Sequence, residues 1–275
     1  MRENKKSGEE KKGEVRVELK DRREKGRVAF ITLDHQHKLN VVNTPLLEKL
    51  TQAFVDLKGD ERLRAAVLTG AGKRAFIGGA DINEMVDFDP DTGKAFITRL
   101  HGVCAAIRDL PVPVIARISG YCLGGGLEIA ASCDLRLATE DAQFGMPEVR
   151  VGLPSVIEAC LLPKLMGWGK AREMVYTGQS ITAAEARQCG LVDRVVAPEN
   201  LDRALEDWIE AILKAGPKAI RMQKVLIRHW EKLPIDEAVK AGIKAFRQTW
   251  QSEEPRRLMQ AFLNRPRKVR NRILT

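Results

Sequence analysis

A unit of strand, turn and helix recurs through the first part of the chain, and this repeat limits the fold more than any other feature. Short runs of β-branched and other apolar residues predict the strands, and apolar residues at helical spacing predict the helices. The expected strands cover residues 15–20, 28–33, 65–70, 113–118, 134–138 and 190–196. The expected helices cover residues 44–57, 92–109, 127–132, 157–165, 170–177 and 183–189. Strands that alternate with helices predict an α/β core.

The rest of the chain is expected to be helical. Apolar residues recur at helical spacing over residues 201–215, 218–230, 234–250 and 254–263. These helices are amphipathic and carry large aromatic residues, so we expect them to cover the core or a neighbouring subunit. Residues 1–13 are almost all charged or polar, which predicts a mobile tail. The chain thus divides into a tail (1–13), an α/β core (14–200) and a helical region (201–275).

Composition narrows the class of protein. The chain has 275 residues, of which 44% are hydrophobic, enough for a sizeable globular core. No run approaches the roughly 20 consecutive apolar residues that a membrane-spanning helix needs, and the N-terminus shows no apolar signal segment. The five cysteines form no Cys-x-x-Cys pair, which favours free thiols in a reducing compartment. We therefore expect a cytoplasmic protein that does not contact a membrane.

The net charge of +9 raises the question of a nucleic-acid partner. Much of the excess positive charge lies at Arg256, Arg257 and residues 265–272. No helix-turn-helix, zinc-finger or RNA-binding aromatic signature accompanies it. A basic surface attracts a phosphorylated small molecule equally well. We expect that ligand, or a solvated tail, and no nucleic acid; an RNA- or scaffold-binding protein is the remote alternative.

Two glycine-rich turns predict the chemistry. Residues 74–82 read Arg-Ala-Phe-Ile-Gly-Gly-Ala-Asp-Ile, and residues 120–128 read Gly-Tyr-Cys-Leu-Gly-Gly-Gly-Leu-Glu. Glycines mark tight turns in any α/β protein. The second turn, however, leads into a helix N-terminus, where backbone N–H groups stabilise negative charge. Two such turns can each aim an N–H at one carbonyl oxygen, which is the geometry of an oxyanion hole.

Two glutamates lie 20 residues apart, each after a glycine-containing segment. Glu128 closes the second turn, and Glu148 closes Gln-Phe-Gly-Met-Pro-Glu at residues 143–148. Either glutamate alone is explained as an acid at a helix start or as an exposed loop acid. Together with the two turns, they can share general acid and general base work on the carbons beside a carbonyl. The sequence therefore predicts chemistry on an activated acyl group.

Other kinds of site have less support. Neither turn has the spacing of a dinucleotide or P-loop site, and no Gly-x-Ser-x-Gly elbow marks a serine hydrolase. The four histidines show no metal-ligand spacing, so we expect no metal and interpret them as structural or surface residues. His37 or the neighbouring Lys38 could contact a phosphate. Asp81 and Glu84 stand where a helix would begin, and helix capping accounts for them.

At these residues the chain resembles the crotonase superfamily, also called the enoyl-CoA hydratase/isomerase family. Residues 75–82 resemble its first oxyanion motif, and residues 120–128 resemble its second. Residues 144–148 resemble the segment that carries the second hydratase glutamate. The resemblance runs from about Val15 to Arg267. It implies a spiral of β-β-α units and a C-terminal helical region that builds homotrimers, commonly paired into homohexamers.

The resemblance also implies a substrate and a role for each residue. An acyl-CoA thioester would place its carbonyl on the N–H groups of Ile77 and Gly125, so coenzyme A is part of the substrate and no separate cofactor is expected. Glu128 would activate a water, and Glu148 would protonate the α-carbon. Further contacts with the substrate or its CoA part are expected from Lys38, Ala75, Gly78, Gly79, Ala80, Asp81, Ile82 and Gly124.

Two acids favour hydration of a trans-2-enoyl-CoA to a 3-hydroxyacyl-CoA. An enoyl-CoA isomerase or an acyl-CoA hydrolase, which would use one acid, is the alternative within the same fold. Two segments depart from the family pattern. Hydratases carry Pro-Gly-x-Gly-Gly after the second glutamate, whereas residues 152–158 lack those glycines and add Glu158. Glu158 is either a third active-site acid or a helix-surface residue. Residues 262–267 also depart from the family's Phe-x-x-Lys-Arg ending.

Overall fold

A six-stranded sheet forms the centre of the computed structural model, which describes residues 12–264. Its strand order is β1-β2-β3-β5-β7-β10. The hairpin of β1 and β2 is antiparallel, and every later neighbour pairs in parallel. The bounds are β1 Glu14–Asp21, β2 Arg27–Asp34, β3 Leu63–Gly70, β5 Val114–Ile118, β7 Leu135–Thr139 and β10 Arg194–Val196.

A second, smaller sheet has the order β4-β6-β8-β9. Its strands are three residues long: β4 Ala75–Ile77, β6 Tyr121–Leu123, β8 Gln143–Gly145 and β9 Ser180–Thr182. Along the chain β4 follows β3, β6 follows β5, and β8 follows β7, so each unit crosses both sheets before its helix. Because β4, β6 and β8 are neighbours in one parallel arrangement, the segments that leave them lie side by side.

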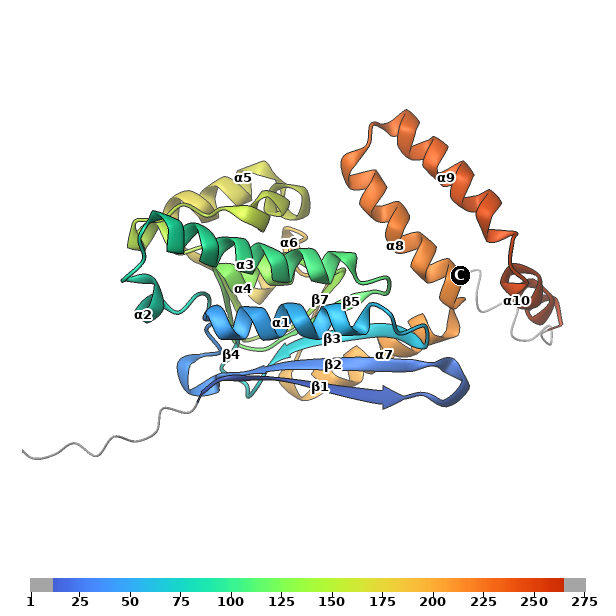
Figure 1. Cartoon of the computed structure of the whole chain (residues 1–275), viewed down its shortest axis with the longest axis horizontal. Helices are drawn as coiled ribbons and strands as arrows, with labels where there is room; N and C mark the ends of the chain where they lie inside the picture. The colour runs from blue at the N-terminus through green and yellow to red at the C-terminus, as the bar shows by residue number, and fades with distance from the viewer. Residues whose placement is uncertain (1–11, 265–275) are drawn as a thin grey trace, which may run out of the picture.

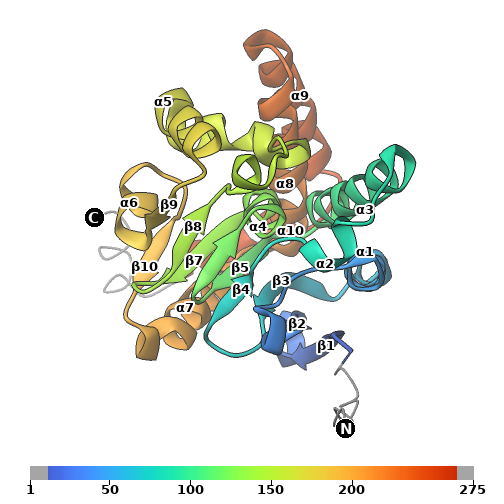
Figure 2. The ribbon, with the colours of Figure 1, turned by 90° about the vertical axis from the view of Figure 1, so that its left-hand side faces the viewer.

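Helices cover both faces of the central sheet. The helices are α1 Thr44–Leu57, α2 Ile82–Met85, α3 Pro90–Asp109, α4 Gly125–Ser132, α5 Leu162–Thr177, α6 Ala183–Gln188 and α7 Leu201–Lys214. Alternate residues of β3 face opposite ways: Ala66 and Leu68 join the core that includes α1 and α3, whereas Ala65 and Val67 pack with α7. Figure 2 shows α7 on the other side of the sheet from α1 and α3. Burial on both faces explains the continuous apolar run of β3.

Three further helices extend from this body: α8 Pro217–Lys232, α9 Ile235–Thr249 and α10 Glu254–Leu263. In Figure 1, α8 and α9 form a pair that stands away from the sheets. The buried Lys224 fixes α8 to the core, because its Nζ donates to the carbonyl oxygens of Ile107 and Val112 and pairs with Asp134 at 2.8 Å. None of the helices within residues 12–264 is long and apolar enough to cross a membrane.

The structure corrects the expected helices after residue 156. Residues 157–165 and 170–177 were expected to form two helices. Ile157–Leu161 is instead a 3-10 segment (η4), whereas the expected break between two helices is present inside α5, at Gly167. Gly167, with φ 79° and ψ 155°, kinks α5 and accounts for the apparent break in the pattern. Residues 1–11 of the expected tail and the basic segment 265–272 lie outside the described residues, as does half of the departing segment, residues 265–267.

Candidate active site

The two glycine turns meet in the structure. Gly126 packs so closely against β4 that a Cβ placed on it would lie 2.2 Å from the carbonyl oxygen of Ile77. On the other side, a Cβ on Gly79 would lie 3.3 Å from the carbonyl oxygen of Leu123. Only glycine permits such an approach at Gly126. The parallel pairing of β4 with β6 therefore brings the predicted oxyanion segments, 75–82 and 120–128, into direct contact.

Backbone N–H groups are concentrated where these turns meet. Helix α4 begins at Gly125, two residues earlier than expected, and its N-cap Gly124 has φ 51° and offers no side chain to cap it. The first N–H groups of a helix have no partner within the helix, and the N-terminus favours negative charge. Ile77 ends β4, an edge strand of the small sheet. This arrangement suits an anionic oxygen bound between the two turns.

Glu128 lies in the first turns of α4 and is almost completely buried, with 3% of its surface exposed. Its Oε1 accepts a hydrogen bond from the backbone N–H of Ala159 at 3.0 Å. Burial raises the pKa of Glu128 to about 8; the Ala159 hydrogen bond opposes this shift, and the charges of Glu148 and Glu158 add to it. A carboxyl group with such a pKa can exchange a proton near neutral pH.

Glu148 approaches the same turns from another element. It is the first residue of the 3-10 segment η3 (Glu148–Val151), and a Cβ placed on Gly124 would lie 2.6 Å from its Oε1. Its Oε2 accepts from the hydroxyl of Ser155 at 2.8 Å. Burial raises the pKa of Glu148, although backbone and Ser155 hydrogen bonds favour the charged form. The structure thus brings together the two glutamates and the second turn.

Glu158 is a third acid at this place, and of its two interpretations the structure excludes a helix-surface residue. The residue lies in η4 and is 7% exposed. Its Oε1 accepts from Nδ1 of His101 on α3 at 2.8 Å, whereas its Oε2 has no hydrogen-bond partner among the described residues. The charge of Glu158 helps to raise the pKa of Glu128. The pKa of the Cys104 thiol is raised mainly by burial and further by the charge of Glu158. Contact of η4 with α3 and α4 buries this acid.

The first turn is hydrogen-bonded to the loop between β2 and α1. The N–H of Gly78 donates to the carbonyl oxygen of Leu39 at 2.9 Å. The buried Asn40 holds this loop, because its Nδ2 donates to the carbonyl oxygens of Ala71 and Ala75 at 3.0 and 2.7 Å. The expected substrate contacts Ala75, Gly78 and Gly79 are therefore parts of one hydrogen-bonded scaffold. Ala80 continues it through a β-bridge with Val42.

Lys38, Asp81 and Ile82 lie at the outer part of this scaffold. Asp81 caps α2 by accepting from the N–H of Asn83, as the sequence predicts. Nζ of Lys38 lies 3.6 Å from Oδ2 of Asp81. Burial opposes ionisation of Asp81, but the hydrogen bonds from Asn83 and the charge of Lys38 outweigh it and lower its pKa. Ile82 is exposed. A cation therefore lies near the first turn.

Sequence reasoning missed four residues that shape the site: Asn40, His101, Ser155 and Ala159. Ser155 lies outside any nucleophile motif, yet its hydroxyl donates to Glu148. Ala159 acts through its backbone, which no side-chain pattern reveals. A usable signal existed for Glu158 itself, since it is the one charged residue in the run Val-Ile-Glu-Ala-Cys-Leu-Leu at 156–162.

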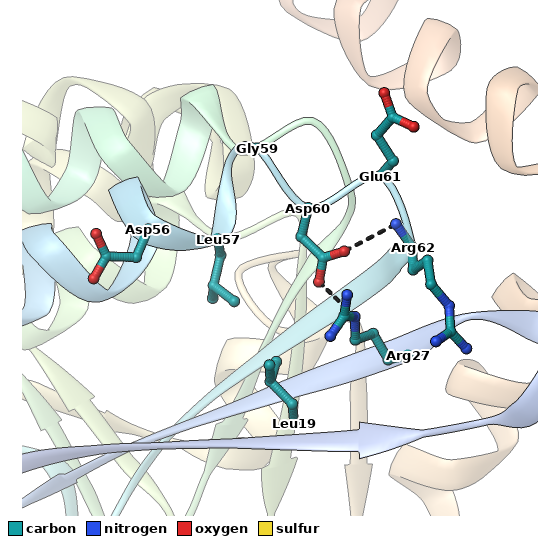
Figure 3. Close-up of a pocket in the computed structure, with 8 residues that line it drawn as sticks. All are labelled: Leu19, Arg27, Asp56, Leu57, Gly59, Asp60, Glu61 and Arg62. Atoms are coloured by element: carbon teal, nitrogen blue, oxygen red, sulfur yellow. Dashed lines mark hydrogen bonds and ion pairs between the residues drawn. The ribbon is translucent and has the colours of Figure 1, made fainter.

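Another depression lies far from these acids. It has a volume of about 470 Å³ and is lined by residues at the end of α1 and the start of β3 (Figure 3). An ion pair of Arg27 with Asp60 at 2.7 Å occupies its wall. The glycine turns follow the opposite, carboxyl ends of the parallel strands, where α/β folds bind ligands. Among residues 12–264, no group of three or more His, Cys, Asp or Glu side chains is arranged to hold a metal ion.

Comparisons with known proteins agree with this geometry. The family model described as enoyl-CoA hydratase/isomerase matches residues 23–270. The chain is 34% identical over 241 residues to a short-chain-enoyl-CoA hydratase of Clostridium acetobutylicum, which covers 87% of this chain and 92% of that protein. It is 32% identical over 240 residues to a crotonyl-CoA hydratase of Syntrophomonas wolfei, with the same two coverages, 87% and 92%. The crystal structure of an enoyl-CoA hydratase from Mycobacterium smegmatis matches with a TM-score of 0.85 at 33% identity, over 90% of this chain and 95% of that one. This likeness confirms the expected crotonase-like α/β fold.

Proposed function

The chain belongs to the enoyl-CoA hydratase/isomerase family, and from this premise we propose that it adds water to a trans-2-enoyl-CoA to give a 3-hydroxyacyl-CoA. One observation carries the proposal. Glu128 on α4 and Glu148 on η3 converge on the point where the two glycine turns touch. Relatives named as hydratases of short-chain enoyl-CoA and crotonyl-CoA support the same reaction.

In this proposal the thioester carbonyl accepts hydrogen bonds from the N–H groups of Ile77 and Gly125. Hydration places negative charge on that oxygen as the C2–C3 double bond is consumed. The N-terminus of α4 and the two backbone donors stabilise this charge more in the transition state than in the substrate. Gly126 packs directly against Ile77, so the two turns are held together. This contact lets the N–H groups of Ile77 and Gly125 donate to the same oxygen.

The two glutamates divide the proton transfers. Glu128 takes one proton from water as the water oxygen bonds to C3, and Glu148 gives its own proton to C2. The other hydrogen of the water remains on the new hydroxyl group. After the reaction Glu128 is protonated and Glu148 is ionised. Transfer of this proton from Glu128 to Glu148 restores the starting state of the pair when the product leaves. Because Glu128 must be ionised to act as a base, its raised pKa links the rate to pH.

The most direct test is to mix the protein with crotonyl-CoA and follow the loss of absorbance of the conjugated thioester. Loss of absorbance with formation of 3-hydroxybutyryl-CoA is expected. An isomerase would instead move the double bond of a 3-enoyl-CoA, and a hydrolase would release free CoA. Either outcome without hydration would replace the proposal by the corresponding alternative. The presence of two acids at one site favours hydration, since each alternative uses one.

The acyl-CoA proposal also predicts selective binding. Backbone donors at the thioester carbonyl, and Lys38 near the CoA phosphates, should make a thioester bind far better than its free acid. We propose no separate cofactor, because coenzyme A enters with the substrate. Calorimetric titration with acetoacetyl-CoA and with acetoacetate tests this point. Equal affinity for acetoacetyl-CoA and acetoacetate would mean that the site does not recognise the CoA part.

We further propose a homotrimer or a homohexamer. Helix α9 exposes large apolar side chains along one face, namely Ile235, Val239, Ile243 and Phe246. Such a continuous apolar face is more than a monomer usually exposes to water. A cytoplasmic location is proposed as well, since all five cysteines, which lie within residues 12–264, are free thiols, as a reducing compartment favours.

A further inference from the structure

The segment that follows Glu148 contains a strained residue. Ile157, the first residue of η4, has φ 29°, in the left-handed region. A β-branched residue is a genuine outlier there, because its side chain crowds the backbone. Such a conformation persists only where the surrounding structure holds it, and strain of this kind gathers at functional sites. Glycine would adopt the same conformation without strain.

The residues on both sides of Ile157 connect to the site. Two residues further on, the N–H of Ala159 is shared between the carbonyl oxygen of Val156 at 2.9 Å and Oε1 of Glu128 at 3.0 Å. Between them, Glu158 turns its carboxylate toward α3, where Nδ1 of His101 lies 2.8 Å from Oε1. The His101–Glu158 hydrogen bond thus connects η4 to α3, and the Ala159–Glu128 hydrogen bond connects η4 to the catalytic acid on α4.

We propose that Glu158 and His101 are positioning residues for the hydration reaction: their hydrogen bond holds Ile157 in its left-handed conformation and thereby keeps the Ala159 N–H on Glu128. This inference rests on the proposed function, because Glu128 is the base of that reaction. Without the bond, Ile157 relaxes toward an unstrained conformation, and the peptide that bears the Ala159 N–H turns with it. Glu128 then loses its donor and its fixed orientation.

The pair also sets the charge around Glu128. The ionisable groups near it are Glu148 on η3, Glu158 on η4, and Cys104 and His101 on α3. Replacement of Glu158 by glutamine keeps an oxygen that can accept from His101 but removes one negative charge. Proton loss from Glu128 then becomes easier. A purely structural role of Glu158 would leave this titration unchanged.

A rescue experiment tests the positional part. His101 is half-exposed, so His101→Ala should fold, and we expect it to lower kcat about 10- to 100-fold with little change in KM. Glycine adopts the left-handed conformation at position 157 without strain, so it no longer needs the His101–Glu158 bond to hold it there. The double variant His101→Ala/Ile157→Gly should therefore regain kcat to within about threefold of wild type. His229→Ala, an exposed histidine on α8, is the matched control and should keep wild-type kcat. Failure of Ile157→Gly to rescue, or full activity of His101→Ala, would overturn the positioning role.

A second readout does not depend on turnover. Carbon-13 NMR of the glutamate carboxyls, assigned with Glu128→Gln, follows the ionisation of Glu128 in the protein without substrate. The titration midpoint of Glu128 should move to lower pH in Glu158→Gln and stay in place in Glu140→Gln, which changes an exposed acid. An unmoved midpoint in Glu158→Gln would overturn the coupling. If wild type fails to hydrate crotonyl-CoA while this shift is seen, the proposed function fails and the coupling of Glu158 to Glu128 stands.

Discussion

The backbone N–H of Ala159 donates to Oε1 of Glu128 at 3.0 Å, across 31 residues of sequence. This bond favours the charged form of a glutamate whose burial and acidic neighbours raise its pKa to about 8. Glu128 is therefore balanced between its protonated and ionised forms near neutral pH. The rate of any reaction that uses it as a base depends on that balance.

The first prediction concerns pH. The mechanism needs one glutamate ionised and the other protonated in the free enzyme, whose state kcat/KM reports. This parameter for crotonyl-CoA should therefore rise as the first glutamate loses its proton and fall as the second does, at a pH of about 8. Initial rates at low substrate from pH 6 to 9.5 measure this. A rate that stays constant or keeps rising as pH passes through 8 would contradict a reaction in which the two glutamates share one proton.

The second prediction concerns stability. The folded pKa of Glu128, about 8, lies above its ordinary value of 4.5, so between these pH values the folded chain holds a proton that the unfolded chain has lost. Stability therefore falls as pH rises from 4.5 to 8, and the full penalty remains above 8. Glu128→Gln removes it and should raise the free energy of unfolding by on the order of 3 kcal/mol at pH 7, and by little at pH 4. Urea unfolding at the two pH values measures this, and equal effects at both would contradict the burial argument.

The third prediction concerns the contact between the turns. A methyl group on Gly126 would lie 2.2 Å from a backbone oxygen that cannot move aside, so Gly126→Ala should force the turns apart. We expect a loss of about 1–3 kcal/mol in stability and of about 100-fold or more in kcat. Gly102→Ala in α3 is the control: its methyl would be 3.8 Å from Thr51, an ordinary contact, and should stabilise the helix slightly. Urea unfolding and the kcat for crotonyl-CoA, measured for both variants, test this prediction.

Much of this account was predictable from the sequence, and particular residues show where prediction stops. The first five expected strands and most helices match because their apolar patterns extend over five or more residues. The sixth strand was expected over residues 190–196 but covers only Arg194–Val196. The strands β4, β6, β8 and β9 were missed, since three residues are too few for any period, and their pairing depends on the long strands that precede them. Glu158 looked like a surface residue because its burial comes from α3, over fifty residues away in sequence.

The same limit applies to the site. Glycine turns and glutamates could be read as single segments, but their convergence follows from the order β4-β6-β8, which no single segment contains. Asn40 gives a further example. Its two bonds to Ala71 and Ala75 join a loop to the first turn across more than thirty residues. Local patterns reveal candidate groups, and the sheet topology decides which of them meet.

The fourth prediction concerns assembly. If the exposed face of α9 contacts another copy, Phe246→Glu buries a charge in that contact and should lower the molar mass from that of the trimer or hexamer toward that of the monomer. Gln248→Glu adds the same charge at an exposed position of α9 outside the apolar face and should leave the mass unchanged. Light scattering at micromolar concentration compares them. A monomeric wild-type protein would refute the assembly proposal.

The central claim is that Glu128 and Glu148 act as a unit on one water. Glutamine keeps the shape of each side chain and removes its ability to take up a proton, so thioester binding should survive each substitution.

Kinetics of Glu128→Gln, Glu148→Gln and the double variant on crotonyl-CoA are the most direct measurement. Each single variant should lose about 10²- to 10⁴-fold in kcat, and the double variant should lose little more than either, because groups that act together are non-additive. Hydration at near wild-type rate by either single variant would contradict the two-glutamate mechanism.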